Sequence, residues 1–564
     1  MSDFWYRNAV VYGVDVGTFL DSDGDGIGDF RGLTRRLDYL QGLGVSCLWL
    51  LPFFPSPNRD NGYDVTDYYG VDPRFGDLGD FVELLREAGS RGMRVMIDLV
   101  VDHTSDEHPW FRAARSDPSS PYRDYYVWTD EPPAEPRHRP IFPGVEDSVW
   151  TWDDEAGAYY FHSFYRFQPA LNHANPAVRE EVERIMGFWL QLGVAAFRVD
   201  AASHMVEAKG SMRFDGDPHD VLREYRAFAA RRRGDVVLMG EADVEAGRLG
   251  EFFGRGDELN LLMNFLLNNY TWLALARKEA EPLVRALHLV PHGHGEGQWA
   301  NFLRNLDEVD LERLTLPERE EVYRAFAPDE DMRIYGRGIR RRLAPMLKGD
   351  RKRIELAFSL LFSLPGTPLL VYGDEIGMGE DLALPEREAV RTAMQWSEDR
   401  NAGFSTADAE RLASPVVQEG RFGYRMVNVA AQERDPGSLL NWMERLVRTR
   451  NGCPEWGWGD FRVLETADPA VFAHRCDRGR DALVAVHNLG GRPARVTLEL
   501  GGGAETLVDL LGGEEHRRLR GTDHTLELEP YGYRWFRLGG TRSRAARPER
   551  GEAGRATNRA GGDG

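Results

Sequence analysis

Eight short apolar runs, separated mostly by stretches with helical spacing, constrain the fold of this chain more than any other feature. Each run is nearly continuous in apolar residues, which is typical of strands buried on both faces of a parallel sheet. Eight such strands joined by helices predict an α/β fold in which the strands close into a (β/α)8 TIM barrel. The runs read AVVYGVDV, SCLWLLPFF, RVMIDLVV, VAAFRVDA, DVVLMGEA, WANFLRN and TPLLVYGDE, with a weaker one, LNLLMNF, around Asn264.

Two departures from this alternation predict the domain organisation. Residues 104–172 are about seventy irregular residues rich in Pro, Trp and Tyr, which is too long for an ordinary loop and predicts a small inserted domain B after the third strand. Residues 456–540 change to short alternating strands and predict a C-terminal antiparallel β-sandwich domain. The barrel is then formed by residues 1–103 and 173–455. The tail, 541–564, is poor in large apolar residues, and we expect it to be disordered.

Composition and charge argue against several classes of function. The formal net charge of −21, without an extended basic patch, makes nucleic acid a poor candidate partner. No apolar stretch approaches the length of a membrane span, and the first residues lack the pattern of a signal peptide. Cys47, Cys453 and Cys476 are too few for a disulfide framework, and no CxxC pair occurs. We therefore expect a cytoplasmic protein without a membrane or nucleic acid partner.

Carboxylates follow several of the predicted strands directly. Asp200 ends the fourth run, Glu241 ends the fifth and Asp307 ends the seventh. A single carboxylate in such a place is usually a helix cap, but three at strand ends of one barrel would converge on one mouth. An ionised carboxylate and a protonated carboxyl group are what a retaining glycosidase needs as nucleophile and acid. Arg198, two residues before Asp200, would point to the same side of its strand and keep Asp200 ionised.

The stretch DSDGDGIGDF, residues 21–30, resembles the first half of an EF-hand calcium loop. Its twelfth position is Gly32 rather than Glu, and an apolar strand rather than a helix precedes it, so a calcium sensor is not predicted. Spacing alone leaves two interpretations open. The loop binds a hard cation, or it is an Asp/Gly turn that bonds its own backbone. The candidate ligands are Asp21, Asp23, Asp25, Ile27 and Asp29.

Seven segments are distinctive in their sequence and order: NGYDVTDYY, DLVVDHTSDEHPWF, FRVDA, MGEAD, FLRNLDE, YGDEIGMG and RTAMQWSEDRNAGFS. Together they closely resemble the α-amylase superfamily of retaining glycoside hydrolases and transglycosylases, glycoside hydrolase family 13. The resemblance runs from about Phe4 to Leu538 and leaves only the tail uncovered. It implies a small α-glucoside as substrate and no organic cofactor.

The resemblance also implies roles for residues at matching positions. Asp200 matches the nucleophile, Glu241 the acid/base, and Asp307 the third carboxylate, which grips sugar hydroxyls and stabilises the transition state. The loop at residues 21–29 matches a loop that binds structural Ca²⁺ or Mg²⁺ in some relatives. The residues that match the surroundings of the first glucose are Tyr63, Asp64, His103, Gln168, Arg198 and Arg391.

Four positions depart from the family pattern: Leu306 replaces His, Ala170 replaces Asp, Asp102 replaces Asn, and Ala393 replaces Pro. Leu306 cannot donate the hydrogen bond that the His gives to the sugar, and a lost transition-state donor costs about 2.7–4 kcal/mol. Two of the changes concern a second calcium site of the relatives. We hypothesise that Asp102 makes up for the charge lost at Ala170 and that Ca²⁺ still binds there through Asp102, Glu207 and backbone carbonyls. The rival hypothesis is that this site is empty.

One leading function and two alternatives follow from the resemblance. Segments such as DPGSLLNWMERL are most similar to family members that interconvert maltose and trehalose through a covalent glucosyl-enzyme, so this intramolecular transglucosylation is the leading expectation. It needs a site that excludes water. An α-glucosidase that hydrolyses short α-glucosides, like an oligo-1,6-glucosidase, would use the same residues in a wetter site. A sugar-binding relative with weakened catalysis is the second alternative, because of Leu306.

Overall fold

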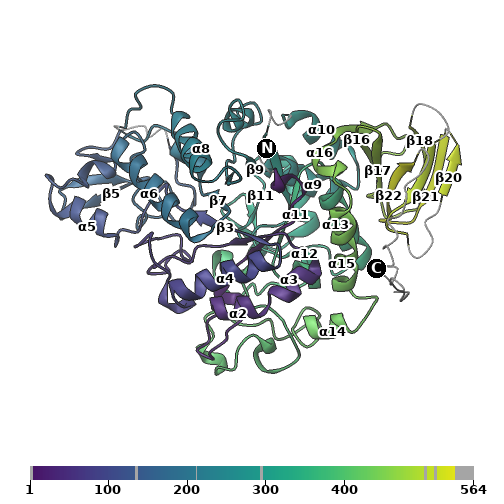
Figure 1. The fold of residues 1–564 in the computed structure, drawn as a ribbon, viewed down its shortest axis with the longest axis horizontal. Helices are drawn as coiled ribbons and strands as arrows, with labels where there is room; N and C mark the ends of the chain where they lie inside the picture. The colour runs from purple at the N-terminus through teal and green to yellow at the C-terminus, as the bar shows by residue number, and fades with distance from the viewer. Residues whose placement is uncertain are drawn as a thin grey trace, which may run out of the picture.

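A closed barrel of eight parallel strands lies at the centre of the computed structural model, which describes residues 4–133, 138–210, 212–291, 296–500, 505–512, 518–521 and 523–539 (Figure 1). Each predicted apolar run supplies one strand, so the predicted (β/α)8 fold is confirmed. The order around the barrel is β1-β14-β10-β9-β8-β7-β3-β2. The strands are β1 (Val11–Val14), β2 (Cys47–Leu50), β3 (Arg94–Leu99), β7 (Ala196–Val199), β8 (Val237–Gly240), β9 (Leu261–Met263), β10 (Gln298–Phe302) and β14 (Thr367–Val371).

Helices surround the barrel, and the local sequence sets where they begin and end. The side chain of Asp77 accepts from the backbone of Asp80, and that of Asp80 accepts from the backbone of Asp77, which starts α4. Asn175 caps α6, and Gly193 ends it with a φ of 118°. The longer helices are α2 (Phe30–Arg35), α3 (Leu37–Leu43), α4 (Leu78–Ser90), α6 (Pro176–Leu192), α8 (Asp220–Arg232), α9 (Phe265–Arg277), α10 (Glu281–Leu289), α11 (Leu316–Phe326), α13 (Arg351–Ser363) and α15 (Leu439–Asn451). Short helices are α1 (Val16–Phe19), α7 (Ala202–Met205), α12 (Leu343–Met346), α14 (Val429–Glu433) and α16 (Glu455–Trp458).

The segment between β3 and α6 forms a small structure of its own at one end of the molecule (Figure 1). It contains α5 (Pro109–Ser116) and a three-stranded antiparallel sheet in the order β4-β6-β5. Its strands are short, and aromatic packing stabilises them: Phe111 meets Tyr126 and Tyr160 edge to face. The strands are β4 (Trp128–Thr129), β5 (Trp150–Asp153) and β6 (Ala158–Phe161).

A second small sheet follows the seventh barrel strand, and the sequence analysis did not predict it. Its order is β11-β13-β12. In the chain, α11 lies between β11 and β12. The strands are β11 (Val309–Asp310), β12 (Arg333–Ile334) and β13 (Gly338–Ile339). They are too short for a pattern of alternating polar and apolar residues to be recognised in the sequence.

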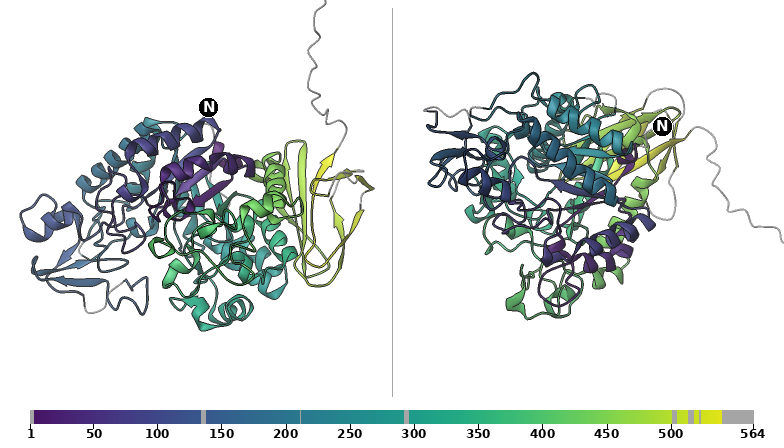
Figure 2. Two further views of the ribbon diagram at one scale, coloured as in Figure 1. Left: turned by 90° about the horizontal axis from the view of Figure 1, so that it is seen from below. Right: turned by 60° about the vertical axis from the view of Figure 1, so that its left-hand side comes forward.

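The C-terminal region contains two antiparallel sheets on the opposite side of the barrel from β4–β6 (Figure 1, Figure 2). Val496 and Leu498 of one sheet share an apolar cluster with Val484 and Phe536 of the other. The six-stranded sheet is β15 (Asp460–Leu464), β16 (Val471–Arg478), β17 (Asp481–Asn488), β22 (Tyr533–Gly539), β19 (Glu505–Asp509) and β20 (Arg518–Gly521), and the two-stranded sheet is β18 (Ala494–Glu499) and β21 (Asp523–Leu528). The tail predicted to be disordered lies outside the described residues. Among the described helices, none has the length and apolar character that a membrane crossing requires.

Candidate active site

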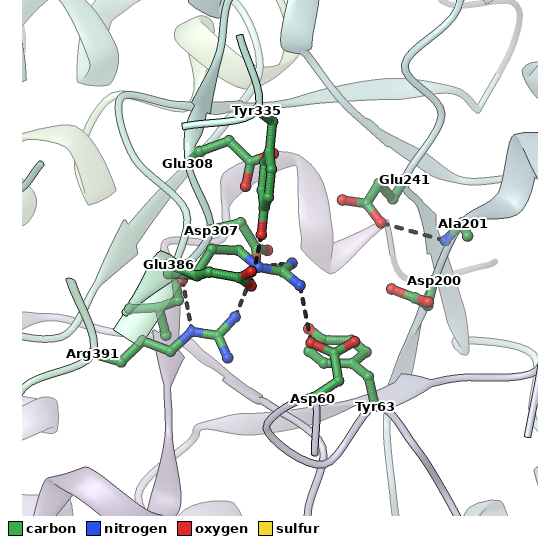
Figure 3. Close-up of polar contacts among 12 residues, drawn as sticks. Asp60, Tyr63, Asp200, Ala201, Glu241, Asp307, Glu308, Tyr335, Glu386 and Arg391 are labelled. Atoms are coloured by element: carbon green, nitrogen blue, oxygen red, sulfur yellow. Dashed lines mark hydrogen bonds and ion pairs between the residues drawn. The ribbon is translucent and has the colours of Figure 1, made fainter. Parts of the chain in front are cut away.

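Three carboxylates from the carboxyl ends of barrel strands converge on one cavity of about 170 Å³. Asp200 directly follows β7, Glu241 directly follows β8, and Asp307 comes after β10. All three line the cavity, together with Tyr63 and Arg198. Figure 3 shows Asp200 and Glu241 on one side of this space and Asp307 on the other. The structure thus brings together the three residues that the sequence placed at strand ends.

Arg198 holds the candidate nucleophile and the candidate acid on one guanidinium group. Its Nη1 donates to Asp200 Oδ1 at 2.6 Å, and its Nη2 lies 2.8 Å from Glu241 Oε2. Nη1 also donates to Asp98 Oδ1 at 2.8 Å. Arg198 is 1% exposed, so its ion pairs with Asp98 and Asp200 are shielded from solvent, whereas the side chain of Glu241 is partly exposed. The guanidinium fixes both carboxyl groups relative to one another, which is the geometric requirement for their joint action.

Burial raises the pKa of both groups, but not to the same level. Burial raises the pKa of Asp200 to about 6, against the opposing charge of Arg198. Burial raises the pKa of Glu241 to about 7. The charge of Arg198 opposes this rise, and the negative charges of Asp200 and Asp307 increase it. The backbone N–H of Ala201 donates to Glu241 Oε2 at 3.3 Å. Glu241 is therefore the group that keeps its proton more readily, as an acid catalyst must.

Asp307 has the opposite environment. Its Oδ1 accepts from Arg387 Nη1 at 2.8 Å and from Arg391 Nη2 at 2.7 Å. Burial alone would raise the pKa of Asp307, but these two arginines lower it to about 2. Asp307 thus stays ionised and can accept hydrogen bonds from sugar hydroxyls at neutral pH.

The wall of the cavity near Asp307 contains two residues that the sequence analysis missed. Arg387 Nη2 donates to Asp60 Oδ1 at 2.9 Å, so this arginine bridges Asp60 and Asp307. Both Asp60 and Arg387 line the cavity. Arg387 lies four residues before Arg391 and Asp60 three residues before Tyr63, so proximity to predicted residues was the only signal in the sequence.

Besides Arg198, four of the predicted substrate-binding residues lie at the cavity or directly behind its wall. Tyr63 and His103 line the cavity, and the Nε2 of His103 lies 3.0 Å from the carbonyl oxygen of Tyr63. Gln168 and Arg391 act from behind it: Gln168 Nε2 donates to Asp60 at 2.8 Å, and Arg391 binds Asp307.

Asp64 is not at the cavity. Its carboxylate accepts from Ser56 Oγ at 2.8 Å and from the backbone of Arg59 at 3.1 Å, which stabilises the turn before Tyr63. The structure therefore assigns Asp60 the place that the sequence analysis gave to Asp64. The physical reason is that the turn directs the Asp60 carboxylate towards Arg387 and the Asp64 carboxylate into the turn itself.

Leu306 lies in the hydrophobic core and is 2% exposed. Its side chain is not part of the cavity lining. Its carbonyl oxygen accepts from Arg391 Nε at 2.8 Å and so helps to fix the guanidinium that binds Asp307. The backbone at this position supports the site, while Arg387 provides guanidinium donors at the neighbouring wall.

The hypothesised second calcium site does not fit the geometry. The buried Asp102 carboxylate is paired with the ammonium of Lys209, which is 1% exposed. Burial would raise the pKa of Asp102, but Lys209 and His103 hold it well below its usual range. Glu207 instead lies 3.7 Å from ring nitrogens of both His138 and His204. The ammonium group of Lys209 neutralises the Asp102 carboxylate, which is the role that the hypothesis gave to Ca²⁺.

Ala170, the other departure at that place, is fully buried in an apolar cluster. Its neighbours include Trp150, Phe161 and Met212. Ala packs among these apolar side chains, where a carboxylate would lose its hydration. Ala170 removes one carboxylate of the relatives' calcium site, and Lys209 neutralises the carboxylate that Asp102 adds.

The geometry of the loop at residues 21–29 is compatible with both interpretations that the sequence left open. Asp21 accepts from the backbone of Gly24 at 2.7 Å and of Gly26 at 2.9 Å, as in a self-bonded turn. Asp21, Asp23 and Asp29 nevertheless have carboxylate oxygens within 4.8 Å of one another, close enough to share one cation. Asp25 is not part of this cluster. These oxygen donors suit Ca²⁺ or Mg²⁺.

Comparison with known proteins identifies the family. Residues 16–456 match the family described as alpha amylase, catalytic domain, and residues 480–537 match the sucrose hydrolase-like, C-terminal domain. The chain belongs to the α-amylase family, and it is an enzyme of the glycoside hydrolase 13 type.

Individual relatives and structures cover nearly the whole chain. The chain is 42% identical over 549 residues to the trehalose synthase of Pimelobacter sp., which covers 95% of this chain and 96% of that protein. It is also 42% identical to the trehalose synthase/amylase TreS of Mycolicibacterium smegmatis, over 95% and 92% of the two chains. The structure of the trehalulose synthase MutB from Pseudomonas mesoacidophila MX-45 is 27% identical, with a TM-score of 0.76 over 95% of this chain and 99% of that one.

Proposed function

We propose that this enzyme interconverts maltose and trehalose by intramolecular transglucosylation. The observation that carries the proposal is the pairing of Asp200 and Glu241 on Arg198 inside a small cavity whose wall is closed by Asp60 and Arg387. Such a cavity accepts a terminal glucosyl unit and leaves little space for water beside the sugar. The 42% identity to trehalose synthases over 95% of the chain supports the choice of substrates.

The reaction follows from the protonation states. The Asp200 carboxylate attacks the anomeric carbon of the terminal glucosyl unit, while Glu241 gives its proton to the glycosidic oxygen, and glucose is released inside the cavity. Asp307 accepts hydrogen bonds from hydroxyls of the bound unit. The released glucose turns, Glu241 removes the proton of its anomeric hydroxyl, and that oxygen displaces Asp200. The product has a new 1,1-linkage, and both carboxyl groups return to their starting states.

Separate incubation of the purified enzyme with maltose and with trehalose tests the proposal. Each sugar formed from the other, with little glucose, is the expected result. Mostly glucose would favour the α-glucosidase alternative. Sugar binding without any product would favour the weakened sugar-binding relative, the alternative that Leu306 suggested.

The pH dependence of activity is expected to follow the two coupled carboxyl groups. Below about pH 6 Asp200 becomes protonated and loses its nucleophilic form, and above about pH 7 Glu241 loses the proton that it must donate. A plot of kcat/KM against pH should therefore be bell-shaped with limbs near these values, which belong to the pair because both groups share Arg198.

A Glu241→Gln variant assigns the alkaline limb. With α-glucosyl fluoride, whose leaving group needs no proton, this variant should keep the acid limb and lose the alkaline one. Glu245→Gln, at an exposed position, is the matched control and should keep both limbs with maltose as the substrate, whereas Glu241→Gln should be nearly inactive with maltose. An alkaline limb that persists in Glu241→Gln would contradict the assignment of Glu241 as the acid.

We further propose that the loop at residues 21–29 binds one structural Ca²⁺ or Mg²⁺ through Asp21, Asp23, Asp29 and backbone oxygen near Ile27. Three carboxylates that face one another within 4.8 Å need a counter-charge, and the cation would supply it.

We also retain the prediction from the sequence that the enzyme works in the cytoplasm.

Calcium added to protein stripped of metal is expected to raise Tm. At a concentration one hundred times Kd the stabilisation is about 2.7 kcal/mol. Calorimetric titration should give one site in the wild type and none in Asp23→Ala. Asp25→Ala is the matched control, since Asp25 lies outside the carboxylate cluster, and it should still bind. Equal binding by the wild type and Asp23→Ala would contradict this site.

A further inference from the structure

Three distant segments of the chain meet at the carboxylate of Glu386, the first residue of the 3₁₀ helix η7 (Glu386–Val390). Its Oε2 accepts from Tyr165 Oη at 2.8 Å and from Tyr335 Oη at 3.0 Å. Figure 3 shows Glu386 and Tyr335 next to one another. Tyr165 follows β6 of the inserted segment, and Tyr335 lies in the turn between β12 and β13. Glu386 therefore links the inserted segment, the small sheet after β10 and the loop after β14.

The two tyrosine rings pack on a third aromatic ring that belongs to the cavity. The Phe142 ring lies 4.7 Å from the ring of Tyr165 and 4.7 Å from that of Tyr335, measured between centroids. All three rings are at least nine-tenths buried. Phe142 and its neighbour Ile141 line the cavity. The hydrogen bonds at Glu386 thus fasten the part of the inserted segment that lines the cavity.

The backbone at this junction is in an uncommon conformation on both sides. Tyr335 has a φ of 54° and Glu386 a φ of 38°, in the left-handed region that residues other than Gly and Asn rarely adopt. Such conformations persist where the surrounding contacts enforce them, and they gather at functional sites. Here the two strained residues are joined directly by a side-chain hydrogen bond, which provides such a constraint.

The next residue in the chain, Arg387, is the cavity-wall arginine that bridges Asp60 and Asp307. Its guanidinium also lies over the Phe142 ring, 5.1 Å from the centroid. Glu386 itself is outside the cavity lining. Glu386 is therefore connected to the site in two ways: through the two tyrosines to Phe142, and through the backbone to Arg387.

We propose that Glu386 is a positioning residue that decides whether the glucosyl unit on Asp200 passes to sugar or to water. The inference rests on the proposed function and goes beyond it by naming the contact that keeps the cavity closed while glucose turns. When the contact is lost, the cover of Phe142 and Tyr165 separates from Tyr335, and water reaches the glucosyl-enzyme. Water then attacks in place of the glucose hydroxyl, Glu241 takes its proton, and free glucose results.

The test compares Glu386→Ala with Glu386→Gln. The Ala variant leaves both tyrosine hydroxyls without their acceptor, and we expect the ratio of glucose to trehalose formed from maltose to rise about tenfold. The kcat of interconversion should fall about tenfold, while the rate of glucose formation from maltose stays near its wild-type value. The amide oxygen of Gln can accept both hydroxyls, so Glu386→Gln should restore most of the wild-type ratio. Glu388→Ala, an exposed carboxylate on the same 3₁₀ helix, is the matched control.

The outcomes are distinguishable from those of the proposed function. A wild-type enzyme that gives only glucose from maltose contradicts the proposed function, and the partition is then measured with added glucose as acceptor, where the same shift is expected. An unchanged partition in folded Glu386→Ala overturns the inference, and so does a Gln variant as defective as Ala. If Glu386→Ala does not fold, Tyr165→Phe and Tyr335→Phe each remove one hydrogen bond, and each should shift the partition part of the way.

Discussion

Replacing Asp200 by Ala is expected to lower the kcat of maltose–trehalose interconversion by about 10⁴-fold or more, because no other group can form the covalent glucosyl-enzyme. The variant should remain folded. Arg198 keeps its ion pairs with Asp98 and Glu241, and the raised pKa of Asp200 shows that burial of its ionised form is unfavourable. We expect its free energy of unfolding to lie within about 1–2 kcal/mol of the wild type.

Azide separates a missing nucleophile from a damaged site. With α-glucosyl fluoride, azide can enter the space left in Asp200→Ala and attack from the same face, which would give β-glucosyl azide. Asp217→Ala, an exposed carboxylate that pairs with Arg223 near the start of α8, is the control and should keep wild-type activity. Interconversion by Asp200→Ala at more than about a hundredth of the wild-type rate would contradict the role of Asp200.

Replacing Arg198 by Met is expected to have the largest effect on stability. The buried carboxyl groups of Asp98 and Asp200 and the partly buried one of Glu241 lose their shared counter-charge. Breaking a buried ion pair by removing one partner costs about 3–5 kcal/mol. Without Arg198 the pKa of Asp200 and of Glu241 rises further, so the nucleophile is protonated at neutral pH and activity is lost as well.

The pH dependence of that loss distinguishes electrostatics from packing. Because the folded-state pKa of these carboxyl groups lies above their unfolded value, the folded state binds more protons, and the stability of the variant falls as pH rises. Denaturant unfolding should therefore show a smaller difference from wild type at pH 5 than at pH 8. Arg86→Met removes an exposed ion pair on α4 and should change stability little at either pH. A loss in Arg198→Met that is equal at both pH values would indicate a packing effect instead.

The sequence could predict the barrel and the central carboxylates because their signals are local. Each barrel strand is a continuous apolar run, and Asp200 and Glu241 directly follow such runs. The carboxyl ends of parallel barrel strands meet at one mouth, so residues that are far apart in the chain become neighbours by topology alone. Topology predicts which strand ends lie close together, but not how the side chains at those ends contact one another.

The contacts that could not be predicted from the sequence are those between residues of different loops. Arg387 and Asp60 are 327 residues apart and meet because two irregular segments fold over the same wall. The turn before Tyr63 directs Asp60 rather than Asp64 to the cavity, which depends on backbone conformation and not on residue type. The hypothesis of calcium at Asp102 failed for the same reason, since Lys209 is 107 residues away and its side chain could not be placed from the pattern.

The Lys209–Asp102 pair has a consequence for how this enzyme meets changing surroundings. A metal ion dissociates, competes with other ions and is removed by chelators, whereas an ammonium group that belongs to the chain is always present at its site. Its occupancy has no dissociation constant and does not vary with dilution or with the supply of cations. The strand end that carries His103, next to Asp102, therefore keeps its counter-charge from synthesis onwards, whatever the supply of cations in the medium.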